Sequence, residues 1–334
     1  MIKVEGDPKC PIKAANSLEV VAISQKPRKA YLSKNLIALL SYGGVPEEFF
    51  QGLLMSALEE TKSVFKKKRA AVRVAMNHGE SDDSFTSARM LSVGIPLDEP
   101  YLQFRLCQLA NEEKKKFRGG KIPISESYYL MGTSDPTDTL NSDEVCVILE
   151  RGQISGKVLV YRNPCLHFGD IHVMTAKPVE AIQDVVGNAK YGIFFSTKGI
   201  KSAAAEMGNG DFDGDVYWVS QHPELLEKFN QCMPWTRALP TPPADEIKAR
   251  KPGDFSPHGL EIELFRQLQD ARNSSISMGV AADSWLAHMD WFLMLGDADV
   301  EQKKYLRQKI LKLIDIYYDA LDAPKSGKKV CVSI

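Results

Sequence analysis

The chain has 334 residues, enough for two or three cooperating units, because single hydrophobic cores seldom grow beyond about 250 to 300 residues. Hydrophobic residues make up 44% and charged residues 25%, which excludes a wholly disordered chain. Lysine and arginine number 42 against 43 aspartates and glutamates, so the bulk charge gives no long-range attraction for phosphate backbones, and any nucleic-acid contact must use local patches.

The first third of the chain is predicted to be helical. Apolar residues recur at helical spacing after Pro46, which predicts a helix from there to about Ala75. Further helices are predicted around Ser84–Leu91 and from Glu99 to the polar run NEEKKKFR, before two glycines close the region. We therefore expect residues 1–120 to form a mostly helical connector.

From Lys121 the hydrophobic period changes to two, which is typical of β-strands. Short turns rich in glycine, aspartate, asparagine and proline separate the runs, and only Val179–Val186 has the pattern of a helix. This spacing favours a compact β-barrel over residues 121–220. The predicted strands are KIPISESYYLMG, VCVILE, KVLVYRN, IHVMTA, YGIFFS and VYWVS.

Helical patterns return after Ser220, first in PELLEKFNQ and then, beyond a proline-rich linker, in three long stretches. Residues 221–334 are therefore expected to form a helical region. Two apolar stripes in it predict core packing: Leu260, Leu264, Leu268 and Ala271 in one, and Tyr305, Ile310, Leu313, Ile314 and Tyr317 in the other.

Basic residues gather in three short runs, and solvated helix ends or tails explain each run taken alone. They are Lys66, Lys67, Lys68 and Arg69, then Lys114, Lys115, Lys116, Arg118 and Lys121, and then Lys325, Lys328 and Lys329.

The six cysteines show no C-x-x-C pair, which argues against structural zinc and suits a reducing intracellular compartment. No stretch reaches the roughly 18 apolar residues of a membrane span. We expect a soluble intracellular protein without a membrane contact, in a compartment that the sequence leaves undecided between nucleus and cytoplasm.

The segment GNGDFDGDVYW holds an acidic cluster, in which Asp211, Asp213 and Asp215 alternate so that three carboxylates can point the same way while Phe212 faces the core. Three neighbouring anions repel each other unless a cation neutralises them, and oxygen-only ligands select hard ions such as Mg²⁺, with Mn²⁺ as an alternative. Glycines on either side allow a tight turn. The cluster therefore predicts a metal site.

Two other interpretations of this turn remain open. Asn209, Asp211, Asp213 and Gly214 fit positions one, three, five and six of a calcium-binding EF-hand loop, but position twelve would be Ser220 instead of glutamate. A solvated acidic turn without a ligand is the second alternative. Catalysis of nucleotidyl transfer suits the cluster better, because that chemistry uses two carboxylate-bound metals to activate a hydroxyl and stabilise the leaving pyrophosphate.

Two linked motifs carry a resemblance to a known family. GNGDFDGD resembles the NADFDGD signature of the largest subunit of multisubunit RNA polymerases, and VLVYRNPCLHFGD upstream resembles that subunit's VLLNRxPTLHxxG motif. The cellular RNA-dependent RNA polymerases of RNA silencing match more of the chain, including KIPISESYYLMGTSDPTDTL. With Phe212 between the first two aspartates, the turn resembles that of a plant-like branch of the family, which reads DFDGD.

The resemblance implies an α+β fold whose catalytic part is the second double-psi β-barrel of the two-barrel RNA polymerases, flanked by helical segments. It implies that Asp211, Asp213 and Asp215 hold the catalytic Mg²⁺. Arg162 and Asn209 match residues that approach the ribose of the incoming nucleotide, and a guanidinium and an amide can both donate to a 2′-hydroxyl. Structural roles, at a strand end for Arg162 and as a turn cap for Asn209, stay open. The matched residues of the upstream block, among them His167 and Asp170, are expected to shape the barrel instead of transferring protons.

The family also implies an RNA-directed RNA polymerase that makes double-stranded RNA from a single-stranded RNA template and ribonucleoside triphosphates, with Dicer-like and Argonaute proteins as partners. The family's first barrel precedes the region matched here, so we expect a partial polymerase chain. Two other functions remain: a catalytically inactive RNA-binding module and, less favoured, a calcium-binding loop protein.

Overall fold

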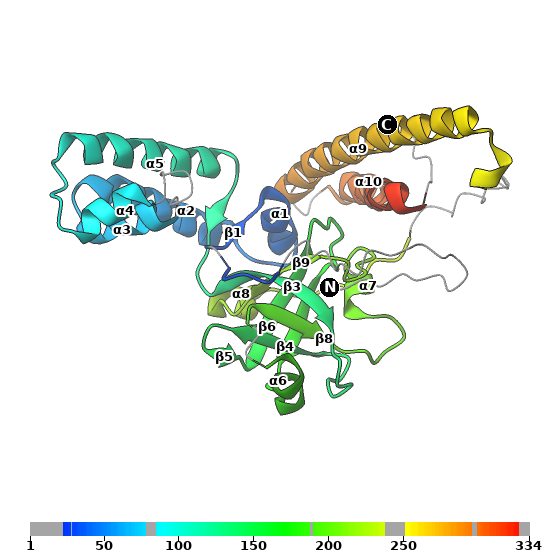
Figure 1. Ribbon diagram of the computed structural model, residues 1–334, viewed down its shortest axis with the longest axis horizontal. Helices are drawn as coiled ribbons and strands as arrows, with labels where there is room; N and C mark the ends of the chain where they lie inside the picture. Colours follow the sequence, from blue (N-terminus) through cyan, green and yellow to red (C-terminus); the bar gives the residue numbers. More distant parts are fainter. Residues whose placement is uncertain are drawn as a thin grey trace. The chain divides into compact units, whose positions relative to one another are not determined.

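The computed structural model of the chain describes residues 23–27, 29–77, 85–187, 190–237, 251–295 and 299–326, without the side chains of residues 270, 271, 273–275 and 324–326. Contacts divide the chain, which is drawn in Figure 1, into two compact units. The first comprises Met1–Leu32, Glu47–Asn163 and Ile171–Lys228, and the second comprises Ser33–Pro46, Pro164–Asp170 and Phe229–Ile334. The division predicted from the sequence, into residues 1–120, 121–220 and 221–334, stays a prediction.

Helices open the first unit, as predicted, and their apolar faces share one core that includes Val64, Leu91 and Leu102. Helix α5 begins where the sequence indicates, since the Glu99 side chain accepts a hydrogen bond of 2.6 Å from the amide of Leu102. The helices are α2 (Glu47–Lys62), the 3₁₀ turn η1 (Ser63–Phe65), α3 (Lys68–Asn77), α4 (Thr86–Ser92) and α5 (Pro100–Arg118).

The single helix predicted from Pro46 to about Ala75 is wrong, because the chain breaks between η1 and α3. The amides of Lys66 and Lys67 both donate to the carbonyl of Ser63, at 2.9 and 2.8 Å, which closes a turn. Four consecutive cations leave no apolar side chain to bury over a full helical turn here, so the helix has no packing reason to continue.

A six-stranded barrel forms the rest of this unit. Its strands pair in the order β4-β7-β6-β9-β3-β8, and a further pairing between β4 and β8 closes the ring. The β3–β8 and β4–β7 pairs are parallel and the other pairs of the ring are antiparallel. The strands are β3 (Ser127–Ser134), β4 (Glu144–Leu149), β6 (Gly156–Asn163), β7 (Ile171–Ala176), β8 (Gly192–Phe195) and β9 (Val216–Ser220).

Inward-facing apolar residues fill the barrel, among them Leu130, Val158, Val160 and Tyr217. Gly132 makes room for one of them, because a Cβ at this position would lie 2.3 Å from the ring of Tyr217. Smaller elements surround the barrel: β1 (Tyr31–Leu32) with β2 (Ile122–Pro123), β5 (Gly152–Gln153), and the short helices α6 (Glu180–Val186), α7 (Ala203–Glu206) and α8 (Pro223–Lys228).

The second unit is helical. Trp285 and Met289 of α9 and Leu306 and Ile310 of α10 are fully buried, and the two helices contact each other extensively. The described residues contain two long helices here and not the three predicted, because α9 continues without a break through 38 residues. The elements are α1 (Lys34–Tyr42), η2 (Pro252–Asp254), α9 (Pro257–Met294) and α10 (Val300–Ser326).

The two predicted apolar stripes have different outcomes. Ile310, Leu313, Ile314 and Tyr317 are buried, as predicted, although Tyr305 is 51% exposed. The other stripe is wrong as core packing, because Leu264 and Leu268 are 61% and 55% exposed. With 38 residues α9 is longer than α10 with 27, so its N-terminal part extends beyond the face that α10 can cover. The side chain of Ala271 and residues Lys328 and Lys329 lie outside the described part.

The described helices include none that combines the length and apolar character needed to cross a membrane.

Candidate active site

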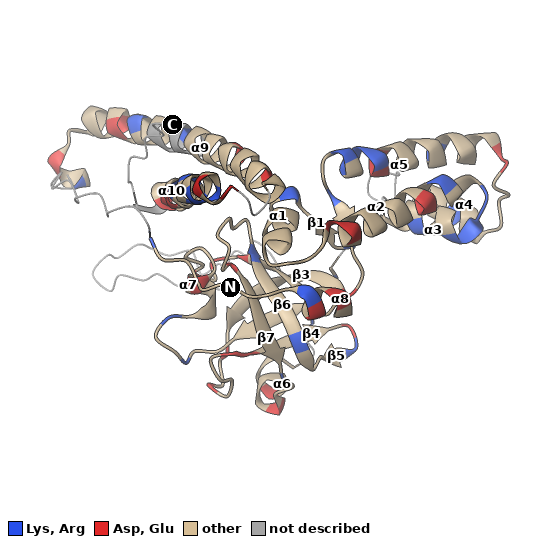
Figure 2. Ribbon diagram, turned by 180° about the vertical axis from the view of Figure 1, so that it is seen from behind, with Lys and Arg blue, Asp and Glu red and all other residues tan. Residues whose placement is uncertain are grey.

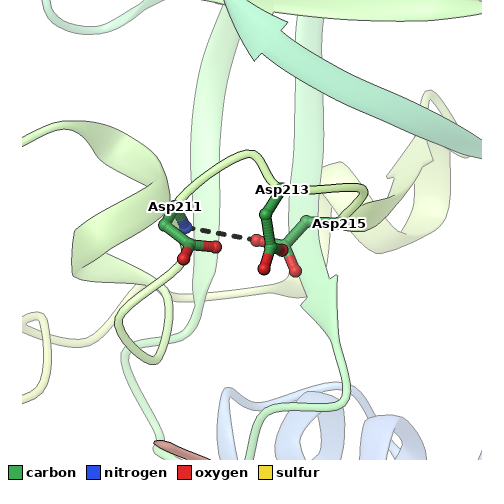
Figure 3. A group of neighbouring side chains, drawn as sticks. All are labelled: Asp211, Asp213 and Asp215. Atoms are coloured by element: carbon green, nitrogen blue, oxygen red, sulfur yellow. Dashed lines mark hydrogen bonds between the residues drawn. The ribbon is translucent and has the colours of Figure 1, made fainter. Parts of the chain in front are cut away.

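The acidic turn lies between α7 and β9, on the barrel. One carboxylate oxygen each from Asp211, Asp213 and Asp215 lies within 4.8 Å of the other two (Figure 3). Asp211 and Asp213 are exposed and Asp215 is half-buried. The structure thus brings together the three carboxylates that the sequence singles out, and their hard oxygen donors fit a divalent ion such as Mg²⁺.

Left-handed backbone conformations give the turn its shape. Phe212 has φ 60°, Asn209 has φ 59° and Gly214 has φ 121°. A positive φ is uncommon for a bulky residue and persists only where the surroundings enforce it. The ring of Phe212 packs against Phe195 and Tyr217, with centroid distances of 5.3 and 6.2 Å, so it faces the core as predicted. This packing anchors the turn between the first two aspartates.

Arg162 reaches the turn from the neighbouring strand. Strands β6 and β9 pair so that Arg162 lies opposite Tyr217, near the start of β9 and directly after the turn. Its guanidinium donates to Asp215 Oδ1 at 2.8 Å and to the carbonyl of Gly208 at 2.7 Å, and the residue is 7% exposed. Arg162 therefore orients one of the three carboxylates. A contact with ribose stays a prediction.

Asn209 is exposed, and its backbone amide donates to the carbonyl of Ala205 at 3.2 Å. Within the described residues its side chain makes no hydrogen bond that would cap the turn. The amide group is thus accessible beside the acidic cluster, and its role toward a nucleotide sugar stays a prediction.

The backbone of Gly210 packs closely against its neighbours. A Cβ at this position would lie 2.7 Å from the carbonyl oxygen of Ala204 and 3.0 Å from Cδ of Arg162. We expect Gly210→Ala to lower the free energy of unfolding by about 1–3 kcal/mol, because the added methyl forces the turn away from α7. It should also weaken Mn²⁺ binding, since the carboxylates would separate. Urea unfolding and metal titration measure the two effects.

Gly52→Ala is the matched control for Gly210→Ala. Gly52 is exposed in α2, and a Cβ there meets nothing within 4 Å. Alanine favours helix by about 1 kcal/mol over glycine, so this variant should be neutral or slightly stabilised. Equal destabilisation by the two substitutions would contradict a steric role for Gly210.

The EF-hand interpretation does not fit the structure. Residues after Gly214 enter strand β9 instead of a helix, and Ser220, at the twelfth position, is fully buried. Its hydroxyl accepts hydrogen bonds from Ser127 Oγ at 2.8 Å and from the amide of His222 at 3.2 Å. It therefore points into the protein and not toward a calcium ion.

The LHFGD block belongs to the second unit and not to the barrel that we expected it to shape. His167 Nδ1 accepts a hydrogen bond of 3.0 Å from the amide of Gly169. Burial, and then the charge of Arg307, lowers the pKa of His167 to about 4, so the ring is neutral at physiological pH. His167 acts as a hydrogen-bond acceptor within this block, and the expectation that it transfers no proton stays a prediction.

Tyr318 of α10 completes a buried network that the sequence analysis missed. Its hydroxyl donates to Asp170 Oδ2 and accepts from the amides of Leu166 and His167, at 3.1 and 3.2 Å. The amide of His167 also donates to Asp170 Oδ2, at 2.6 Å. Tyrosine and aspartate lie about 150 residues apart in sequence, and no local pattern relates them.

Comparison with known proteins places the chain in a family. A family model described as "RNA dependent RNA polymerase" matches residues 1–333. The chain is 54% identical over 99% of its length to "Probable RNA-dependent RNA polymerase 5" of Arabidopsis thaliana, and 49% identical over 99% to "Probable RNA-dependent RNA polymerase 3" of Oryza sativa subsp. japonica. It spans about a third of these relatives, 34% and 30% of their lengths.

A solved structure shows the same fold. "RNA dependent RNA polymerase QDE-1 from Thielavia terrestris" superposes with a TM-score of 0.63 at 16% identity, over 93% of this chain and 37% of that one. The closed ring of six strands with its flanking helices confirms the expected α+β class and the double-psi β-barrel. On the family match and these likenesses, the chain belongs to the RNA-dependent RNA polymerase family.

Proposed function

We propose that this chain supplies the catalytic metal site of an RNA-directed RNA polymerase, which joins ribonucleoside triphosphates on a single-stranded RNA template. The observation that carries the proposal is the convergence of three carboxylates within 4.8 Å on a barrel turn, with Arg162 bonded to one of them. Membership of the family makes this chemistry the first candidate for the site.

Asp211, Asp213 and Asp215 hold Mg²⁺, or Mn²⁺ as an alternative, in this proposal. The bound metal would activate the attacking hydroxyl and stabilise the leaving pyrophosphate. Arg162 keeps Asp215 oriented, and Phe212 holds the turn so that the carboxylates face one side. Arg162 and Asn209 supply donors for the ribose hydroxyls, which distinguish ribose from deoxyribose.

The biological role follows from the resemblance to the polymerases of RNA silencing. We propose that the product is double-stranded RNA for post-transcriptional gene silencing, made inside the cell and passed to Dicer-like and Argonaute proteins. Support for this part comes from the shared motifs and from the plant polymerases that the chain resembles.

A second candidate function is a catalytically inactive module that binds RNA. The resemblance assigns the basic residues that approach the triphosphate to a different barrel, and the described residues contain one ring of six strands. In this case the metal site would persist without turnover.

Incorporation of labelled nucleotide tests the two functions. The purified chain is incubated with a single-stranded RNA template, the four ribonucleoside triphosphates and Mg²⁺. We expect label to enter RNA only when template is present, to stop on chelation with EDTA and to resume when Mg²⁺ is restored. RNA binding without incorporation would support the inactive module, and micromolar calcium binding with indifference to RNA and nucleotides would contradict both.

A further inference from the structure

The run Lys66–Arg69 lies on the helical part of the first unit, away in sequence from the acidic turn. Lys66 and Lys67 form the link between η1 and α3, and Lys68 and Arg69 open α3. All four side chains are exposed, and Phe65 just before them is 40% exposed. In Figure 2, blue ribbon beside the labels α3 and α4 marks Lys and Arg of this helical region.

No carboxylate neutralises this run within the part of the chain that the structure describes. None of its four cationic groups has an acidic partner there within 4.0 Å, whereas Arg73 in the same helix pairs with Glu60 and Lys177 on the barrel pairs with Glu144 at 3.1 Å. Four like charges in consecutive positions repel each other. The arrangement is therefore unfavourable for the folded chain itself.

The helix dipole adds to this unfavourable energy. Lys68 and Arg69 occupy the N-terminal end of α3, whose first turn contains no acidic residue. Unpaired amides make the N-terminus of a helix positive, and a cation there loses about 0.3–1 kcal/mol instead of gaining it. Cations are stabilising at the C-terminal end of a helix, where the dipole is favourable.

The second basic run provides that comparison. Lys115, Lys116 and Arg118 occupy the last turn of α5, where cations stabilise the helix, and Lys116 lies 5.2 Å from the ring centroid of Tyr31. A solvated helix end explains this run fully. It does not explain Lys68 and Arg69, whose position at a helix N-terminus opposes local stability, and such conflicts are typical of functional sites.

We propose that Lys66–Arg69 is an RNA-contact surface that binds the phosphate backbone of a single strand outside the catalytic turn. The four cations and the positive N-terminal end of α3 are suited to anionic oxygens, and the exposed ring of Phe65 can stack on a base. With a net charge of −1, the chain depends on such a local patch to attract RNA. The proposal rests on the proposed function, since it supplies a second contact for the same template.

The test compares two charge-matched variants of the full chain. One changes Lys66, Lys67, Lys68 and Arg69 to glutamine, and the other changes Lys114, Lys115, Lys116 and Arg118 of α5 to glutamine. Fluorescence anisotropy with a labelled oligoribonucleotide measures the dissociation constant at several salt concentrations. Because each phosphate contact contributes about 0.7 to the slope of log K against log salt for single strands, the first variant should lower the slope by about 2–3 and weaken binding about tenfold or more.

The control variant should bind RNA within about twofold of the unsubstituted chain, since it removes the same charge from a run with a structural explanation. Thermal unfolding adds an independent readout. Neutralising Lys66–Arg69 should leave the melting temperature unchanged or raise it, whereas neutralising the α5 run should lower it slightly.

Three outcomes would overturn the proposal. They are equal losses of RNA binding in the two variants, no binding of RNA by the unsubstituted chain, or a first variant that loses binding to vesicles of anionic phospholipid but keeps its binding to RNA. Equilibrium binding requires no turnover, so it separates this surface from the polymerase proposal. If the chain binds RNA through this run but incorporates no nucleotide, the contact surface is supported and only the proposed catalysis is contradicted.

Discussion

Asp213→Ala is expected to abolish magnesium-dependent nucleotide incorporation by an active preparation, with a rate loss of about 10³-fold or more. Asp213 is the middle member of the three carboxylates, and two remaining ligands hold a divalent ion poorly. The side chain is exposed, so its removal leaves the barrel core intact. Incorporation of labelled nucleotide and Mn²⁺ binding followed by electron paramagnetic resonance measure the two losses.

Asp184→Ala is the control for this prediction. Asp184 is an exposed carboxylate on α6, so its removal changes the net charge equally without touching the acidic turn. The control should keep full activity and metal affinity. Should Asp213→Ala retain activity within tenfold of the unsubstituted chain, the turn would not be the catalytic metal site.

Asp170→Ala is expected to lower the free energy of unfolding by about 3–5 kcal/mol. Asp170 is fully buried, and its Oδ2 accepts from the amide of His167 and from the hydroxyl of Tyr318. The hydroxyl of Tyr318 loses its acceptor when the carboxylate is removed. Urea unfolding followed by tryptophan fluorescence is a suitable measurement, since Trp235 packs against Tyr318 with ring centroids 4.9 Å apart.

Asp319→Ala and a double-mutant cycle isolate the buried network. Asp319 forms a bidentate pair with Arg237, but both side chains are partly exposed, so its loss should cost only about 1 kcal/mol. Asp170→Ala and Tyr318→Phe should be non-additive, because each removes the same hydrogen bond. Additive effects of Asp170→Ala and Tyr318→Phe would argue against the network as the main stabilising contact of the LHFGD block. Equal losses of unfolding free energy in Asp170→Ala and Asp319→Ala would argue against it as well.

Local patterns were sufficient to predict most of the elements in the chain. Alternating apolar residues predict β6 and β9 within a residue of their observed bounds, and the helix predicted from Glu99 is α5, which begins at Pro100 with Glu99 as its N-cap. Such patterns reflect the neighbours of each residue along the chain, so they are visible without tertiary contacts. The break before α3 was missed because the cationic run resembles a helix surface and lacks a proline or glycine.

The buried faces were less predictable. Leu264 and Leu268 have the spacing of a core stripe, yet they are exposed, because burial depends on whether a partner helix extends that far. In contrast, Ile310 and Ile314 show the same kind of pattern and are buried. Spacing identifies an apolar face, and only the packing of α9 with α10 decides which part of it is covered.

The same distinction, between what local spacing predicts and what tertiary packing decides, applies to the acidic turn. The sequence by itself determined the three aspartates, the oxygen chemistry that selects a hard divalent ion, and the motifs that relate the chain to its family, because these depend on residue types and short spacing. Only the tertiary structure decided that Arg162 bonds to Asp215 and that Phe212 anchors the turn on Phe195 and Tyr217. Those contacts depend on strand pairing and barrel closure, which bring distant residues together and leave no local pattern.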